Sequence, residues 1–118
     1  MIGINVRNTD VAFADLIVDG IKTIETRNSK SLHPYIGKTV AIVRTGKGKA
    51  FAIGQVNVVG CSLVTDALAF DDLYDQHLVA KHSIFYIKDV KYMYHLGDAV
   101  RYETPKPVGF GIVSRKVF

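Results

Sequence analysis

Alternating apolar and polar residues predict β-strands in several parts of the chain. Residues 2–7 place three aliphatic side chains on one face, the period of two that marks a strand with one buried side. Residues 38–45 and 50–60 are also strand-like and flank Gly46-Lys47-Gly48-Lys49, a sequence typical of a hairpin tip. Other strands are predicted over residues 22–27, 83–93 and 110–117, with a short segment at 98–102 and an irregular turn at 105–107.

The first helical stretch lies between two of these strands. Its predicted N-cap is Asn8 or Thr9, and Asp10 falls in its first turn, where the helix dipole favours a negative charge. The apolar period ends near Asp19. Gly20 then fits the left-handed position that terminates a helix.

A second helix is predicted over residues 65–80, with Thr65 as its N-cap. An apolar stripe follows one side of this helix and four aspartates follow the other. With the strands above, this pattern predicts an α+β fold, a small mixed β-barrel of five to seven strands with two main helices. The length of 118 residues suits one domain, residues 1–118.

Three charged residues lie close together where the first helix gives way to a strand. Side chains alternate along a strand, so Glu25 and Arg27 point to one face while Ile24 and Thr26 point to the other. Lys22 stands at the junction, and its long stem can reach the same face as Glu25. We therefore expect the lysine, the glutamate and the arginine to converge.

The spacing Gly20-x-Lys22-x-x-Glu25-x-Arg27 resembles the signature of the ASCH domain, a family of the PUA-like superfamily. Residues 33–38, 53–59 and 107–111 also resemble this family, so the resemblance covers nearly the whole chain. It implies a PUA-like β-barrel in which the motif lines a cleft for a nucleic acid or a nucleotide-like ligand. Many relatives have Gln-Pro-Trp-Ala where this chain has residues 8–12, so the Trp and Pro that would wall one side of the cleft are missing.

Charge is uneven along the chain, whose formal net charge is +4. Residues 20–60 hold seven basic side chains and one acidic one, whereas residues 61–80 hold four aspartates and no lysine or arginine. A basic block beside a cleft attracts phosphate-bearing partners, although such a block can also be a solvated face. We expect RNA, in preference to DNA, or a nucleotide-like ligand as the partner. The predicted binding residues are Lys22, Glu25, Arg27, Lys30, Tyr35, Lys38, Arg44, Lys47, Lys49 and Phe110.

The converging charges admit two other roles. One is a buried ion network that fixes the turn from helix to strand. The other is catalysis, because a buried lysine with a lowered pKa can act as a base. Some small bacterial ASCH proteins, which this chain resembles in the motif, are amidohydrolases on acetylated cytidine that use a lysine, a threonine and a glutamate, and others are ribonucleases.

For a small hydrolase acting on a modified nucleoside, or a metal-independent ribonuclease, the predicted catalytic residues are Lys22 and Glu25. Lys22 matches the lysine of the amidohydrolases, but Glu25 stands where they have threonine. Asp75 is the nearest candidate for their acidic residue. No cofactor and no metal site are expected.

Several classes are excluded by what the sequence lacks. The lone cysteine, Cys61, excludes an internal disulfide and a zinc-type cluster. Neither an export signal nor an apolar stretch of membrane-spanning length is present, so we expect a cytoplasmic protein without membrane contact. The acidic helix around residues 71–75 offers an alternative surface for a protein partner. The histidines, expected to be surface or packing residues, are His33, His77, His82 and His95.

Overall fold

The structure, a computed structural model that describes residues 1–108 and 114–116, is built on one curved sheet. Its strands are β1 (Ile2–Arg7), β2 (Ile24–Arg27), β3 (Thr39–Thr45), β4 (Phe51–Val64), β5 (Lys91–Pro107) and β6 (Ser114–Lys116). Its helices are α1 (Phe13–Val18), α2 (Ala67–Asp72), α3 (Tyr74–His77) and the 3₁₀-helix η1 (His33–Tyr35).

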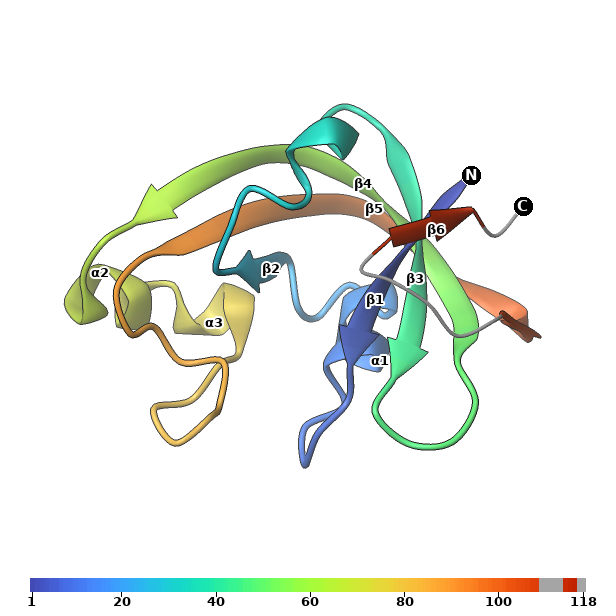
Figure 1. Cartoon of the computed structure of the whole chain (residues 1–118), viewed down its shortest axis with the longest axis horizontal. Helices are drawn as coiled ribbons and strands as arrows, with labels where there is room; N and C mark the ends of the chain where they lie inside the picture. The colour runs from blue at the N-terminus through green and yellow to red at the C-terminus, as the bar shows by residue number, and fades with distance from the viewer. Residues whose placement is uncertain (109–113, 117–118) are drawn as a thin grey trace.

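The sheet has the strand order β2-β5-β4-β3-β1-β6 and is mixed, because β1 and β3 run parallel while the other neighbours are antiparallel. The two longest strands, β4 and β5, pair with three register shifts. Such bulges bend a strand and increase its twist. Figure 1 shows the resulting arch, with α1, α2 and α3 beneath it. The predicted α+β, barrel-like fold is confirmed.

The helix α1 packs its apolar side into the hollow of the sheet, where Phe13, Ile17 and Val18 are buried. Gly54 of β4 permits this contact, since a Cβ there would lie 2.5 Å from Val18 Cγ1 and 2.4 Å from a backbone oxygen of β5. After the helix, Gly20 adopts a φ of 76°, the left-handed conformation predicted for it. The chain thus turns directly from α1 toward β2.

The helix α1 begins later than its sequence predicts. The side-chain oxygen of Asn8 accepts a hydrogen bond from the Ala14 N–H at 2.8 Å, so Asn8 does satisfy a donor of the first turn. Its amide also donates to Asp15 at 2.8 Å. Asp10 lies before the helix and is exposed, and Asp15 takes the place in the first turn that was predicted for Asp10.

The predicted second helix is divided into α2 and α3, which are interrupted at Leu73. Its cap is Asp66 instead of Thr65, because the Asp66 carboxylate accepts the Ala69 N–H at 2.8 Å. Leu78, with a φ of 60°, ends α3 in the left-handed region. This turn directs the last carbonyl group of α3 toward the start of β2.

The strand predicted over residues 83–93, with a possible break near Asp89, is wrong for residues 83–90, which are irregular, and right for residues 91–93, which begin β5. Their aromatic side chains are drawn into separate contacts. Phe85 packs edge to face on Phe13, with 5.9 Å between ring centroids, and the Tyr86 hydroxyl donates to Asp71 at 2.9 Å. Tertiary packing thus overrides the local alternation.

The turn predicted at 105–107 is also wrong, since these residues end β5. Proline is tolerated there because, among the described residues, this end of β5 pairs with β4 alone. Of the strand predicted over residues 110–117, the described part is β6. Phe110 lies outside the described residues. No helix in the described part of the chain is long and apolar enough to cross a membrane.

Candidate functional site

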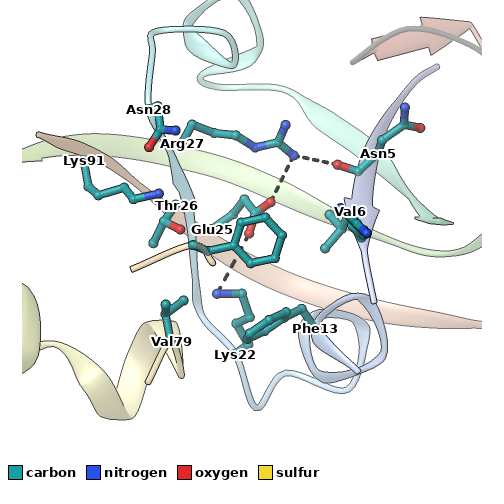
Figure 2. Close-up of a pocket in the computed structure, with 12 residues that line it drawn as sticks. Asn5, Val6, Phe13, Lys22, Glu25, Thr26, Arg27, Asn28, Val79 and Lys91 are labelled. Carbon is teal, nitrogen blue, oxygen red and sulfur yellow. Dashed lines mark hydrogen bonds and ion pairs between the residues drawn. The ribbon is translucent and has the colours of Figure 1, made fainter. Parts of the chain in front are cut away.

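A cavity of about 220 Å³ opens between β1 and β2, where the curved sheet is not closed by strand pairing. Aromatic and aliphatic side chains form part of its wall, and charged side chains from β2 and β5 form the rest. Figure 2 shows most of them pointing inward. The lining residues are Asn5, Val6, Arg7, Phe13, Lys22, Glu25, Thr26, Arg27, Asn28, Val79, Phe85 and Lys91.

Lys22 forms the floor of the pocket and is only 2% exposed. Its Nζ donates a hydrogen bond to the carbonyl oxygen of His77, the last residue of α3. It also lies 3.9 Å from Glu25 Oε1 and 5.1 Å from the centroid of the Phe13 ring. Lys22 therefore contacts α1, β2 and α3, and it presents its ammonium group to the pocket.

Arg27 bridges the gap between the two strands. One of its terminal nitrogens, Nη2, donates to the Asn5 carbonyl oxygen of β1 at 2.6 Å and to Glu25 Oε2 at 3.0 Å. Figure 2 shows the resulting chain of contacts from Lys22 through Glu25 and Arg27 to Asn5. The predicted convergence of the three charges is confirmed. The Arg27 Nε is buried and has no hydrogen-bond partner within the described residues.

Burial controls the protonation of this region. It lowers the pKa of Lys22 to about 8, an effect that the nearby Glu25 carboxylate opposes. Burial likewise lowers the pKa of His77. The His77 Nδ1 accepts the Val79 N–H at 2.8 Å, so Nε2 carries the proton and donates to the Phe70 carbonyl at 2.7 Å. His77 is thus a neutral packing residue, as predicted.

Lys91 is a second buried lysine of the pocket, with 3% of its surface exposed. It enters from the first position of β5 and lines the same pocket as Thr26 (Figure 2). Burial lowers its pKa too, while Glu25 opposes the shift. Lys91 was not predicted as a site residue, but it stands two positions before the buried Met93, so it shares a face of β5 with a core residue.

The other predicted binding residues lie away from this pocket. Arg44 faces α1, with Nη1 3.5 Å from Asp15 Oδ1, and its guanidinium lies over the Phe51 ring at 6.0 Å. Tyr35 is half-buried in η1 and packs against the core. Four lysines are exposed, two of them at the hairpin tip between β3 and β4; these are Lys30, Lys38, Lys47 and Lys49. None of these residues is among the described residues that line the cavity.

The weaker catalytic candidate, Asp75, is exposed in the first turn of α3 and does not line the pocket. The predicted acidic surface is partly engaged within the fold, because Asp71 accepts from Tyr86 and lies 3.7 Å from the Lys81 Nζ. A protein partner at that surface stays a prediction. In the part of the chain that the structure describes, no cluster of histidine, cysteine or acidic side chains is arranged to hold a metal ion.

Sequence reasoning missed the walls of the pocket. Phe13 and Phe85 come from α1 and from the irregular segment before β5, and Asn5 comes from β1. Asn28 directly follows the motif, so proximity in sequence pointed to it. The two phenylalanines have no such signal, because their places depend on how α1 and the later segment meet in space.

No protein-family model matches the sequence, and no curated protein matches it either. The fold is nevertheless similar to solved structures of an ASCH protein from Zymomonas mobilis. The unmutated protein aligns with a TM-score of 0.66 and 20% identity, over 84% of this chain and 69% of that one. A substitution mutant of the same protein, ZmASCH, aligns with a TM-score of 0.71 and 19% identity, over 91% of this chain and 72% of that one. These similarities establish a shared fold.

Proposed function

We propose that the pocket binds an unpaired nucleotide of single-stranded nucleic acid, with RNA preferred over DNA. The observation that carries this proposal is a pocket with partly apolar walls in which Lys22 and Arg27 contact one carboxylate, Glu25, and which Lys91 also lines. A concave, largely apolar site with a few converging polar groups is the usual form of a ligand pocket.

The size of the cavity supports a ligand no larger than one nucleotide unit. Pockets for drug-sized molecules measure roughly 300–1,000 Å³, and this one measures about 220 Å³. A double helix has no means of entering it, whereas an unstacked base or sugar does. Sequence-tolerant recognition of single strands combines such entry with stacking on aromatic side chains, and Phe13 and Phe85 line the pocket.

The polar groups suit the edges of a nucleotide. Glu25 can accept a hydrogen bond from an exocyclic amine or from a ribose hydroxyl, a group that DNA lacks at the 2′ position. Thr26 and Asn28 add further polar side chains to the lining, and Asn5 contributes its backbone carbonyl oxygen (Figure 2). The shared fold with an ASCH protein and the full Gly20-x-Lys22-x-x-Glu25-x-Arg27 motif support an ASCH-like nucleic-acid-binding module.

A fluorescence titration of labelled single-stranded RNA tests the proposal. The wild type and Lys22→Ala are compared at low and at physiological salt, with Lys47→Ala as a matched loss of one charge outside the pocket. We expect micromolar binding that weakens with salt and falls by about tenfold in Lys22→Ala, while Lys47→Ala changes little. Absence of binding at both salt concentrations would contradict the proposal.

A second candidate function is hydrolysis in the same pocket, on a modified nucleoside or on RNA. The lowered pKa of Lys22, about 8, favours it, because a neutral amine is then available near neutral pH to take a proton from water or from a hydroxyl group. The Glu25 carboxylate, 3.9 Å from the Lys22 Nζ, would orient the nucleophile or the substrate.

Lys22→Arg separates the two functions, since arginine keeps the positive charge but does not deprotonate. Acetylated cytidine and the labelled RNA are each incubated with the wild type and with this variant, and products are followed by chromatography. For a hydrolase, turnover occurs in the wild type and is lost in Lys22→Arg while binding persists. Binding without any product in the wild type would leave the binding module as the function.

A further inference from the structure

Lys91 has an unusual position for a charged side chain. It is 97% buried and reaches into the pocket from the start of β5. Within residues 1–108 and 114–116, no hydrogen bond or ion pair holds its ammonium group. Its electrostatic surroundings are mixed, because Glu25 attracts it while Arg27 and Lys88 repel it.

The one carboxylate of the pocket is already engaged. Glu25 Oε1 faces the Lys22 Nζ at 3.9 Å, and Oε2 faces the Arg27 Nη2 at 3.0 Å. Among the buried and half-buried side chains of the pocket, three cations therefore stand against one anion, which leaves an excess of two positive charges; the exposed Arg7 adds one more at the lining. Burying a charge without a counter-ion is strongly unfavourable. A fold that retains such a lysine at the wall of an open cavity is arranged for an anion that comes from outside.

We propose that the counter-ion of Lys91 is a phosphate group of the ligand, bound between Lys91 and the Lys22–Arg27 pair. This inference rests on the proposed function and makes it more specific: the pocket recognises a phosphorylated nucleotide, and a neutral nucleoside lacks its main contact. A phosphate monoester brings nearly two negative charges and so nearly balances the excess, whereas a phosphodiester brings one and halves it. Thr26 lines the same pocket and offers a hydroxyl donor to the same group.

The first test measures thermal unfolding of the full chain in inorganic phosphate, with sodium chloride at equal ionic strength as the reference. Phosphate stabilises the wild type in a saturable manner, because it binds the folded state alone. Lys91→Met loses this shift and, without phosphate, is at least as stable as the wild type, since an uncompensated charge is gone. Lys88→Met, which removes an exposed neighbouring charge, keeps the full shift.

Two results would overturn the inference. One is a Lys91→Met protein that phosphate stabilises as much as it stabilises the wild type. The other is a Lys91→Met protein that unfolds or is strongly destabilised, which would mean that the lysine serves the fold itself. Lys91→Arg provides a further check, because it keeps the charge and should retain most of the phosphate shift.

Calorimetric titrations with uridine, uridine 5′-monophosphate and a short single-stranded RNA identify the source of the phosphate. The monophosphate should bind the wild type about tenfold more tightly than uridine does, and this difference should vanish in Lys91→Met. If RNA binds equally well to both proteins, the role of Lys91 is wrong while RNA binding stands. If the monophosphate requires Lys91 but RNA does not bind, RNA binding is wrong and the phosphate site stands.

Discussion

Two clusters of charge in this molecule differ in burial and in balance. The first, the α1 network, joins Asp15 and Asp19 of the α1 region to Arg44 and Arg101, with contacts of 2.7 Å between Arg101 Nε and Asp19 Oδ1 and 3.1 Å between Arg101 Nη2 and Asp15 Oδ1. It holds as many carboxylates as guanidinium groups. The second cluster, in the pocket, holds three buried or half-buried cations and one carboxylate, and the fourth cation of the lining, Arg7, is exposed.

The difference in charge balance indicates that the two clusters have different roles. In the α1 network the hydrogen bond from Arg101 holds the pKa of Asp19 below its usual value, so the charged states stabilise each other. In the pocket burial lowers the pKa of Lys22 and of Lys91, so the folded state disfavours their charge. A balanced, partly exposed network is complete without a ligand. An unbalanced, buried one is completed by an anion that the chain itself lacks.

The largest expected effect comes from removing the one negative charge of the pocket. Glu25→Gln leaves Lys22, Arg27 and Lys91 without a carboxylate, and loss of one partner from a buried ion pair costs about 3–5 kcal/mol. The free energy of unfolding, measured by urea denaturation, should fall by that amount. Asp19→Asn is the matched change in the α1 network, where exposed pairs contribute about 1 kcal/mol or less. Equal losses in both variants would remove the distinction between the clusters.

The second effect is a pH dependence that belongs to the pocket. The pKa of Lys22 is about 8 in the folded chain, below its ordinary value of 10.5, so between these values the unfolded state binds more protons. Stability therefore rises with pH across this range, by about 2 kcal/mol between pH 8 and pH 10. Lys22→Met should lack this rise. The difference between wild type and variant cancels the titration of tyrosines common to both, and parallel pH profiles would contradict the assignment.

A third change keeps the positive charge at position 27 but removes the planar guanidinium group. Arg27→Lys retains a cation but cannot contact the Asn5 carbonyl and Glu25 with one planar group. Losing such a charge-assisted contact should lower the free energy of unfolding by about 1–2 kcal/mol. Arg44→Lys is the control, because its contact with Asp15 is 3.5 Å long and partly exposed. A smaller loss in Arg27→Lys than in this control would show that the bridge between β1 and β2 is dispensable.

The smallest effect is expected at the hairpin tip. Lys47 and Lys49 are exposed, so replacing both with alanine should change the free energy of unfolding by less than about 0.5 kcal/mol. RNA affinity should fall no more than about threefold, with a slightly shallower salt dependence. A loss as large as that of Lys22→Ala would place the binding surface at the tip and away from the pocket.

Local patterns predicted the parts of the site that depend on neighbours in sequence. Alternation along β2 and the left-handed turn at Gly20 were enough to bring Lys22, Glu25 and Arg27 together. The strand 2–7 and the hairpin of β3 and β4 were also predicted, because the first has a regular apolar alternation and the second a glycine-rich tip. These features arise from backbone geometry that acts over a few residues.

The rest depended on contacts between distant segments. Residues 83–90 alternate like a strand, yet Phe85 and Tyr86 are held by Phe13 and Asp71 in an irregular path. That path determines where β5 starts and therefore where Lys91 enters the pocket. A charged residue at the first position of a long strand is ordinary in sequence, and its burial becomes visible only when β1, β2 and β5 are seen together.

The most direct measurement is a ¹H–¹⁵N NMR titration of the wild type with a short single-stranded RNA, because it reports the pocket and the basic hairpin tip in one experiment. We predict that chemical-shift changes concentrate at residues 22–28 and around Lys91, and that the amides of residues 46–49 at the hairpin tip move little. Shifts confined to the tip, or no shifts at RNA concentrations well above the protein concentration, would contradict binding of an unpaired nucleotide in the pocket.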